Sequence, residues 1–174
     1  APLLRNHVEL TSRDRFVKAG EAYFAPNMRW VIFQAVPVPA QGAAPDRFYS
    51  MYVAKLTRDG GGAEGRITGI EEPILVSPPG SANTCGWFHP QEPCRILFGS
   101  TILPPAEQQA AGFQVGTRKY QWQFPEETEV VTRRVREIYE DCKAHLPKGA
   151  KVDFEVWKPE LEQLMPMFSR PRYD

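Results

Sequence analysis

The chain lacks an excess of either charge, a long apolar run and an export signal at its start. Its 21 Lys and Arg residues balance 21 Asp and Glu residues. Nucleic-acid binders and polybasic membrane-surface proteins carry a basic excess or stripe, so both classes are disfavoured. The apolar runs fall far short of the ~18–20 residues that span a bilayer. No transmembrane segment is therefore expected, while the Ala-Pro start fits a mature or trimmed N-terminus and leaves an earlier export signal open.

Cysteine is scarce, and its spacing predicts neither a disulfide framework nor a metal site. Cys85, Cys94 and Cys142 include no C-x-x-C pair. In a hairpin built on 84–88 and 95–98, Cys85 faces a residue near Leu97, so a bridge to Cys94 is poorly registered. The three histidines show none of the ligand spacing of zinc sites. We expect buried or half-buried thiols, no bound metal and no cofactor.

Motifs for catalysis are also absent. The segment "DGGGAEG" lacks the Lys-Ser/Thr of a phosphate loop and reads as a hairpin tip, and neither G-x-S-x-G nor H-E-x-x-H occurs. Ser81, Cys85 and His89 lie close in sequence and raise the idea of a thiol–histidine pair. No third group is evident to orient it, and His89 falls in a predicted turn. We therefore predict that the chain has no catalytic residues and is not an enzyme.

Two similar phrases and many prolines are what the chain does contain. The 17 prolines argue for loops and interrupted edges and against a helix bundle. The stretches "AYFAPNMRWVIFQA" from Ala22 and "GWFHPQEPCRILFGS" from Gly86 share an aromatic pair, a proline and an apolar run ending in Phe. We predict equivalent core positions at Phe24/Phe88 and Phe33/Phe98, and equivalent turn positions at Pro26/Pro90.

Around the first phrase, alternating apolar residues predict strands near 22–24, 29–36, 47–56 and 66–77. Four short antiparallel strands in a period of about 64 residues are typical of a β-propeller blade. From Pro125 the periodicity becomes helical, which predicts a helix over 126–145 with acidic residues in its first turn. A strand over 151–157 and one or two helical turns over 159–168 follow.

The doubled phrase resembles the "F-S-P-D-G-x-x-I-x-F-x-S" phrase of TolB-like, WD-type bacterial β-propellers, over roughly residues 17–101. Both turns depart from the family's Asp-Gly, with Asn27-Met28 in one and residues 91–93 in the other. The resemblance implies a mainly β fold of antiparallel β-propeller-like blades, a partial propeller with a C-terminal helical segment. We divide the chain into an N-terminal extension (1–16), two repeats (17–124, with an insertion at 102–124) and a helix-plus-strand segment (125–174).

Members of that family are mostly non-catalytic binding platforms of the bacterial envelope. The resemblance therefore implies a protein-interaction module, a scaffold or accessory subunit in the periplasm or envelope, whose partners are other protein subunits. Two alternatives stay open: the propeller portion of a longer hydrolase, and a propeller that binds a sugar or another small ligand. For the partner contact we select the aromatic residues of the insertion, because long insertions are often functional. These are Tyr120, Trp122 and Phe124.

Overall fold

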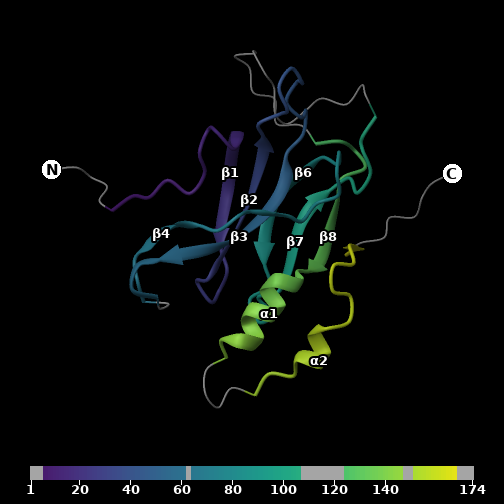
Figure 1. Ribbon diagram of the computed structural model, residues 1–174. Coiled ribbons are helices and arrows are strands. Elements are labelled where there is room, and N and C mark those ends of the chain that lie inside the picture. The colour runs from purple at the N-terminus through teal and green to yellow at the C-terminus, as the bar shows by residue number, and fades with distance from the viewer. Residues whose placement is uncertain (1–5, 62–63, 107–123, 147–150, 168–174) are drawn as a thin grey trace.

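The computed structural model describes residues 6–61, 64–106, 124–146 and 151–167, and this part of the chain is mainly β, as predicted. It forms two antiparallel sheets (Figure 1). The first sheet runs β1-β2-β3-β4, with β5 also pairing with β3. The second runs β6-β7-β8-β9. The strands are β1 (Phe16–Phe24), β2 (Trp30–Pro37), β3 (Ser50–Arg58), β4 (Ile67–Ile70), β5 (Ile74–Leu75), β6 (Asn83–Phe88), β7 (Arg95–Ser100), β8 (Glu129–Arg134) and β9 (Met165–Pro166).

The predicted helix over 126–145 is only half right. Helix α1 spans Arg136–Ala144, but the residues before it form β8. Val130, Val131 and Thr132 are β-branched and suit a pleated strand better than a helix. The free edge of β7 offers backbone hydrogen bonds to these residues, and β8 pairs with it along six consecutive residues. A tertiary hydrogen-bond partner has overridden a helical periodicity.

The last two predicted elements are wrong. The predicted strand over 151–157 contains the short helix α2 (Phe154–Trp157), which the Asp153 side chain caps by accepting a hydrogen bond from Glu155 N. Where helical turns were predicted over 159–168, the chain instead adds β9 to the edge of β8. Pro166 explains part of this difference, because a proline inside a helix removes a hydrogen bond, whereas an edge strand tolerates it.

The hairpins β1–β2 and β6–β7 pair in the same pattern, although their sequences differ. Each has a bulge at the same place, opened by one residue with a left-handed backbone, Glu21 (φ 50°) or Cys85 (φ 49°). The pairs that flank the bulge are Gly20↔Gln34 and Tyr23↔Ile32 in the first hairpin, and Thr84↔Gly99 and Trp87↔Leu97 in the second. Every such residue lies 64 or 65 positions from its counterpart, and the second turn accounts for the extra residue.

The same correspondence extends to the third and fourth strands. Phe33 pairs with Tyr52 and Tyr52 with Leu75, while Phe98 pairs with Val131 and Val131 with Pro166. We call β1, β2, β3 and β5 the first unit, and β6, β7, β8 and β9 the second unit. They differ between their third and fourth strands. The first unit has the 3-10 turn η1 (Asp59–Gly61) and β4 there, whereas the second has α1 and α2.

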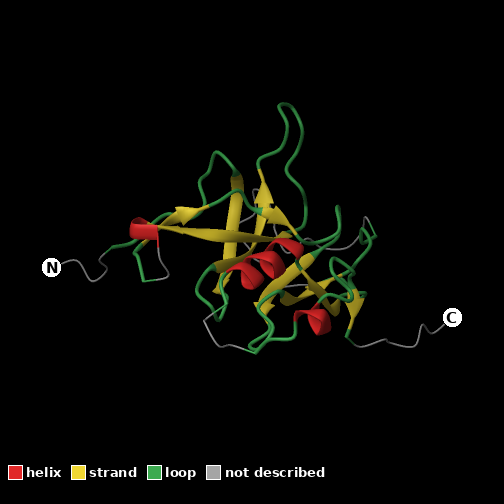
Figure 2. Ribbon diagram, turned by 60° about the horizontal axis from the view of Figure 1, so that its bottom comes forward, coloured by secondary structure: helices red, strands yellow, loops and turns green. Residues whose placement is uncertain are grey.

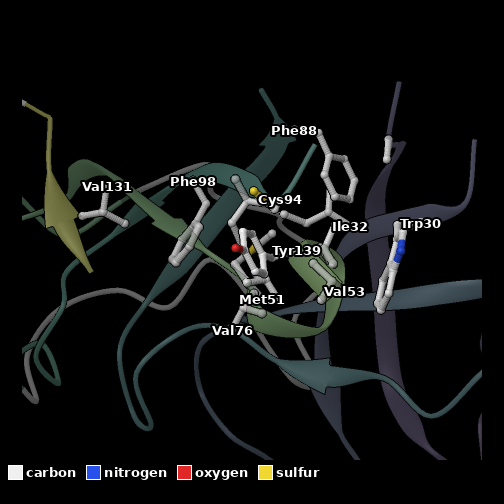
Figure 3. Close-up of a cluster of buried hydrophobic side chains, with 14 residues drawn as sticks. Trp30, Ile32, Met51, Val53, Val76, Phe88, Cys94, Phe98, Val131 and Tyr139 are labelled. Atoms are coloured by element: carbon white, nitrogen blue, oxygen red, sulfur yellow. The ribbon is translucent and has the colours of Figure 1, made fainter. Parts of the chain in front are cut away.

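The main core lies between the two sheets and under α1. Ile32 and Met51 from the first sheet point into the same space as Phe88 and Phe98 from the second, and Tyr139 of α1 joins them (Figure 3). Gly86 permits the close approach of β6, since a Cβ at this position would overlap the side chains of Met51 and Ile32. Helix α1 contributes to the same core and lies across the ends of both sheets (Figure 1, Figure 2).

A second apolar cluster covers the opposite face of the first sheet. The Phe16 ring packs edge-on against Phe33, with ring centroids 5.6 Å apart, and Leu10 and Ile67 add to the cover. The predicted core position Phe24 is wrong: its side chain lies at the rim of this face and is 47% exposed, while its counterpart Phe88 is 2% exposed. The reason is tertiary, because a sheet packs over Phe88, whereas Phe24 lines an open hollow.

Candidate interaction face

The side of the second sheet that faces away from the core is largely apolar. Ile96, Phe98 and Val131 point into the core, so the strand alternation turns their neighbours outward. We call this outward surface the open face. It consists of Trp87, Leu97, Val130, Thr132, Met165 and Met167. Trp87 is 51% exposed, Val130 37% and Met167 50%, while the other three are half-buried.

Each residue of the open face has a counterpart in the first unit. Four counterparts are buried in the core between the sheets, and the other two, Tyr23 and Ile74, are half-buried against it. We call this set the docked face, because the second sheet packs on it. By strand pairing it consists of Tyr23, Ile32, Met51, Val53, Ile74 and Val76. The chain thus exposes a surface whose equivalent within the same molecule is covered by a four-stranded sheet. Contiguous exposed apolar surface of this kind marks interaction sites.

Trp87 is held in place at one edge of the open face. Its ring lies against Tyr23, with centroids 4.4 Å apart and planes tilted by 51°. The two aromatics occupy equivalent positions on β1 and β6, so this contact joins the two units along their first strands. A half-exposed tryptophan fixed by a neighbour loses little conformational entropy when a partner covers it.

The end of the open face carries two arginines whose charges are already paired. Arg95 and Arg134 lie opposite each other on β7 and β8. Glu92 forms salt bridges with both arginines, at 3.4 Å from Arg95 and 3.0 Å from Arg134. Glu160 forms another with Arg134 at 2.8 Å. The Arg134 side chain is only 6% exposed. The open face therefore ends in a neutralised rim, in which two arginines are balanced by two glutamates.

Ser81, Cys85 and His89 are not assembled into a catalytic set. The Nδ1 atom of His89 accepts hydrogen bonds from the backbone of residues 91 and 92 and thereby closes the β6–β7 turn. The Ser81 hydroxyl donates to the Pro78 carbonyl at 2.7 Å. Cys85 is exposed in the bulge of β6. Each residue thus has a local structural role.

The main charged cluster in the described residues lies at the junction of α1 with the first sheet. Asp141 is buried on α1, and Arg29 contacts it with two nitrogens at 2.7 and 2.9 Å. Lys55 Nζ lies 2.8 Å away, Trp30 Nε1 donates at 3.1 Å, and the ring of His145 lies 3.4 Å from the carboxylate. This carboxylate ties the helix of the second unit to strands β2 and β3 of the first.

Electrostatics keep the cluster ionised and the buried thiols protonated. Burial raises the pKa of Asp141, but the hydrogen bonds from the two cations and the indole outweigh it and hold this pKa well below its usual range. Burial also raises the pKa of Cys94 to about 12 and that of Cys142 to about 11. Neither thiol is therefore a nucleophile at neutral pH.

The predicted contact residues are described only in part. Tyr120 and Trp122 lie outside the described residues, and Phe124 is 39% exposed just before Pro125. Among the described residues, no group of His, Cys, Asp and Glu is arranged to hold a metal ion. In the same part of the chain, every helix is too short or too polar to cross a membrane.

Sequence reasoning missed the open face and Asp141, although signals for both exist. Aligning the two phrases places Trp87 and Leu97 opposite Tyr23 and Ile32, which marks them as one face of a repeated strand pair. Asp141 follows Ile138 by three residues, on the buried side of α1, where an acid requires a partner.

Comparison of the chain with family models, with curated proteins and with solved structures gave no match.

Proposed function

We propose that this protein is a non-catalytic protein-interaction module, a scaffold or accessory subunit of a larger assembly, built from two propeller-like units. The observation that carries the proposal is the open face. Its six positions correspond one by one to positions of the first unit, four of which are fully buried against the second sheet while two are half-buried beside it. A surface with the packing chemistry of a sheet interface, exposed beside a neutralised rim, suits a protein partner.

The matched strand pairing supports the propeller-like part of the proposal. Two units of four antiparallel strands, each with a bulge at the same residue of its first strand, support it, and the spacing that the doubled phrase predicts holds over the first two strands of each unit. The non-catalytic part rests on the local partners of Ser81 and His89 and on the raised pKa values of Cys94 and Cys142.

Site-specific photo-cross-linking tests the proposal. A benzophenone amino acid replaces Leu97 on the open face in one variant and Val156 on α2 in a matched control, where the native side chain is 61% exposed. We expect the variant at position 97 to form one adduct of fixed mass in the cells that make the protein, and the control to form none. No adduct at position 97, or identical adducts at both positions, would refute the proposal.

The resemblance to envelope propellers extends the proposal to a periplasmic or envelope location. Fractionation of the native cells tests this part independently, because release of the protein by osmotic shock would support it. Recovery only with cytoplasmic markers would exclude that location and leave the binding function untouched.

A further inference from the structure

We propose that the partner of the open face is a four-stranded antiparallel sheet that the described residues do not supply, which packs on this face through its own exposed apolar side, as the second sheet packs on the first. This inference rests on the proposed function and names the kind of partner. The molecule itself contains the template for the contact, since the docked face shows what such a surface accepts: alternating apolar residues of the first three strands of a sheet, led by Phe88, Ile96 and Phe98.

A second copy of this chain does not fit in the same way. To dock as the second sheet does, a copy would have to offer the opposite face of its own first sheet, the face equivalent to Phe88, Ile96 and Phe98. That face is already covered: Phe16 packs on Phe33 and Tyr52, and Leu10 and Ile67 lie beside it. Val31 and Phe33 there are 2% and 3% exposed. Within the described residues, the outer side of the first sheet is therefore covered, whereas the outer side of the second sheet is not.

The template also sets a size requirement for the partner. The second sheet approaches the docked face through Gly86, which lies against Ile32 and Met51. The counterparts of these two residues on the open face are Leu97 and Val130. The partner's first strand therefore has a glycine or another small residue where it crosses this pair.

Charge contributes little to the contact. At the docked face, the cation Lys55 is paired by Asp141, which belongs to the packed second unit. Its counterpart Arg134 is paired within its own unit, by Glu92 and Glu160. The partner brings no carboxylate to this position, so binding is driven by apolar contact and changes less than about twofold between low and high salt.

The test supplies the missing sheet from the chain itself. A probe chain carries Leu10→Ala, Phe16→Ala and Ile67→Ala to uncover the outer face of its first sheet, together with Leu97→Arg to block its own open face. The wild-type chain, alone and mixed with this probe, is followed by sedimentation velocity. We expect the wild type and the probe to be monomeric separately and to form a 1:1 complex together. Trp87→Asp in the wild-type chain weakens this complex at least about tenfold, and Val156→Asp leaves it unchanged.

Two outcomes overturn the inference. One is a wild-type dimer that Leu97→Arg abolishes, which would assign the open face to a second copy. The other is the absence of a complex when circular dichroism shows a folded probe; if the triple substitution prevents folding, Phe16→Ala with Leu97→Arg replaces it. Either result, combined with a cross-linked adduct at position 97, would leave the interaction function standing and reject only the kind of partner.

Discussion

The docked face and the open face occupy the same positions in two units that pair their strands alike, yet four of the six docked residues are fully buried, whereas every residue of the open face is half-buried or exposed. Ile32 is fully buried, whereas its counterpart Leu97 is half-buried. The residue types are similar: Tyr23 and Trp87, Ile32 and Leu97, and Met51 and Val130 are apolar pairs. What differs is whether a sheet packs on them. Burial is thus a property of the position in the assembly, and the open face keeps the chemistry of a contact.

The largest effect is expected from a substitution in the docked face. Ile32→Ala removes a side chain from the centre of the core and leaves a cavity, so we expect the free energy of unfolding to fall by about 4 kcal/mol. Urea denaturation followed by circular dichroism measures the change. Leu97→Ala is the matched control and costs at most about 1 kcal/mol, because the half-exposed site leaves no enclosed cavity. Equal losses would contradict the distinction between the faces.

The Asp141 cluster is the next largest contribution to the junction between the units. Asp141→Ala leaves two cations and an indole N–H without their acceptor, and we expect a loss of about 3 kcal/mol in thermal or urea unfolding. Glu140→Ala is the control. Its carboxylate is on the exposed side of α1, 3.9 Å from Lys143, so its loss costs less than about 1 kcal/mol.

The same cluster predicts a pH dependence. The pKa of Asp141 is lower in the folded protein than the ~3.9 of an unfolded chain, so its contribution is fully present above that value. This contribution is lost as the pH falls below ~3.9, which makes the wild type less stable in acid. We expect Asp141→Asn to flatten the stability–pH curve between about pH 5 and pH 2. An unchanged acid slope in the variant would show that other carboxylates account for it.

A smaller loss of stability is expected where β6 approaches the first sheet most closely, at Gly86. Gly86→Ala places a methyl group against Ile32 and Met51, and we expect a loss of about 2 kcal/mol from overpacking. Gly20→Ala on β1 is the control. Nothing lies within 4 Å of a Cβ at that position, so unfolding measurements should show no loss. A neutral Gly86→Ala would mean that the sheets separate without cost.

The smallest effect concerns the thiols and leaves stability unchanged. With iodoacetamide at about pH 8, only about 1 in 10,000 Cys94 side chains is ionised, given a pKa of about 12. We expect exposed Cys85 to be alkylated first, and Cys94 and Cys142 only when the protein unfolds. Peptide mass mapping over time follows the order. Rapid modification of Cys94 in the folded protein would contradict its burial between the sheets.

Local sequence determined the mainly β class, most strands of the first unit and the alternating apolar positions. These features follow from strand periodicity and turn residues, which act over a few neighbouring positions. The doubled phrase also indicated two related hairpins, and their pairing does match. The same local reasoning failed after Pro125, because β8 and β9 form only when an open strand edge offers hydrogen bonds that are distant in sequence.

Only the tertiary structure decided which apolar residues became core. Phe24 and Phe88 hold the same place in the doubled phrase, and one is 47% exposed while the other is 2% exposed. The sequence of a strand specifies which side of it is apolar, but the free energy of burial depends on what packs against that side. For Asp141 likewise, the helix placed an acid on its buried face, and the approach of Arg29 and Lys55 from another sheet made that burial stable.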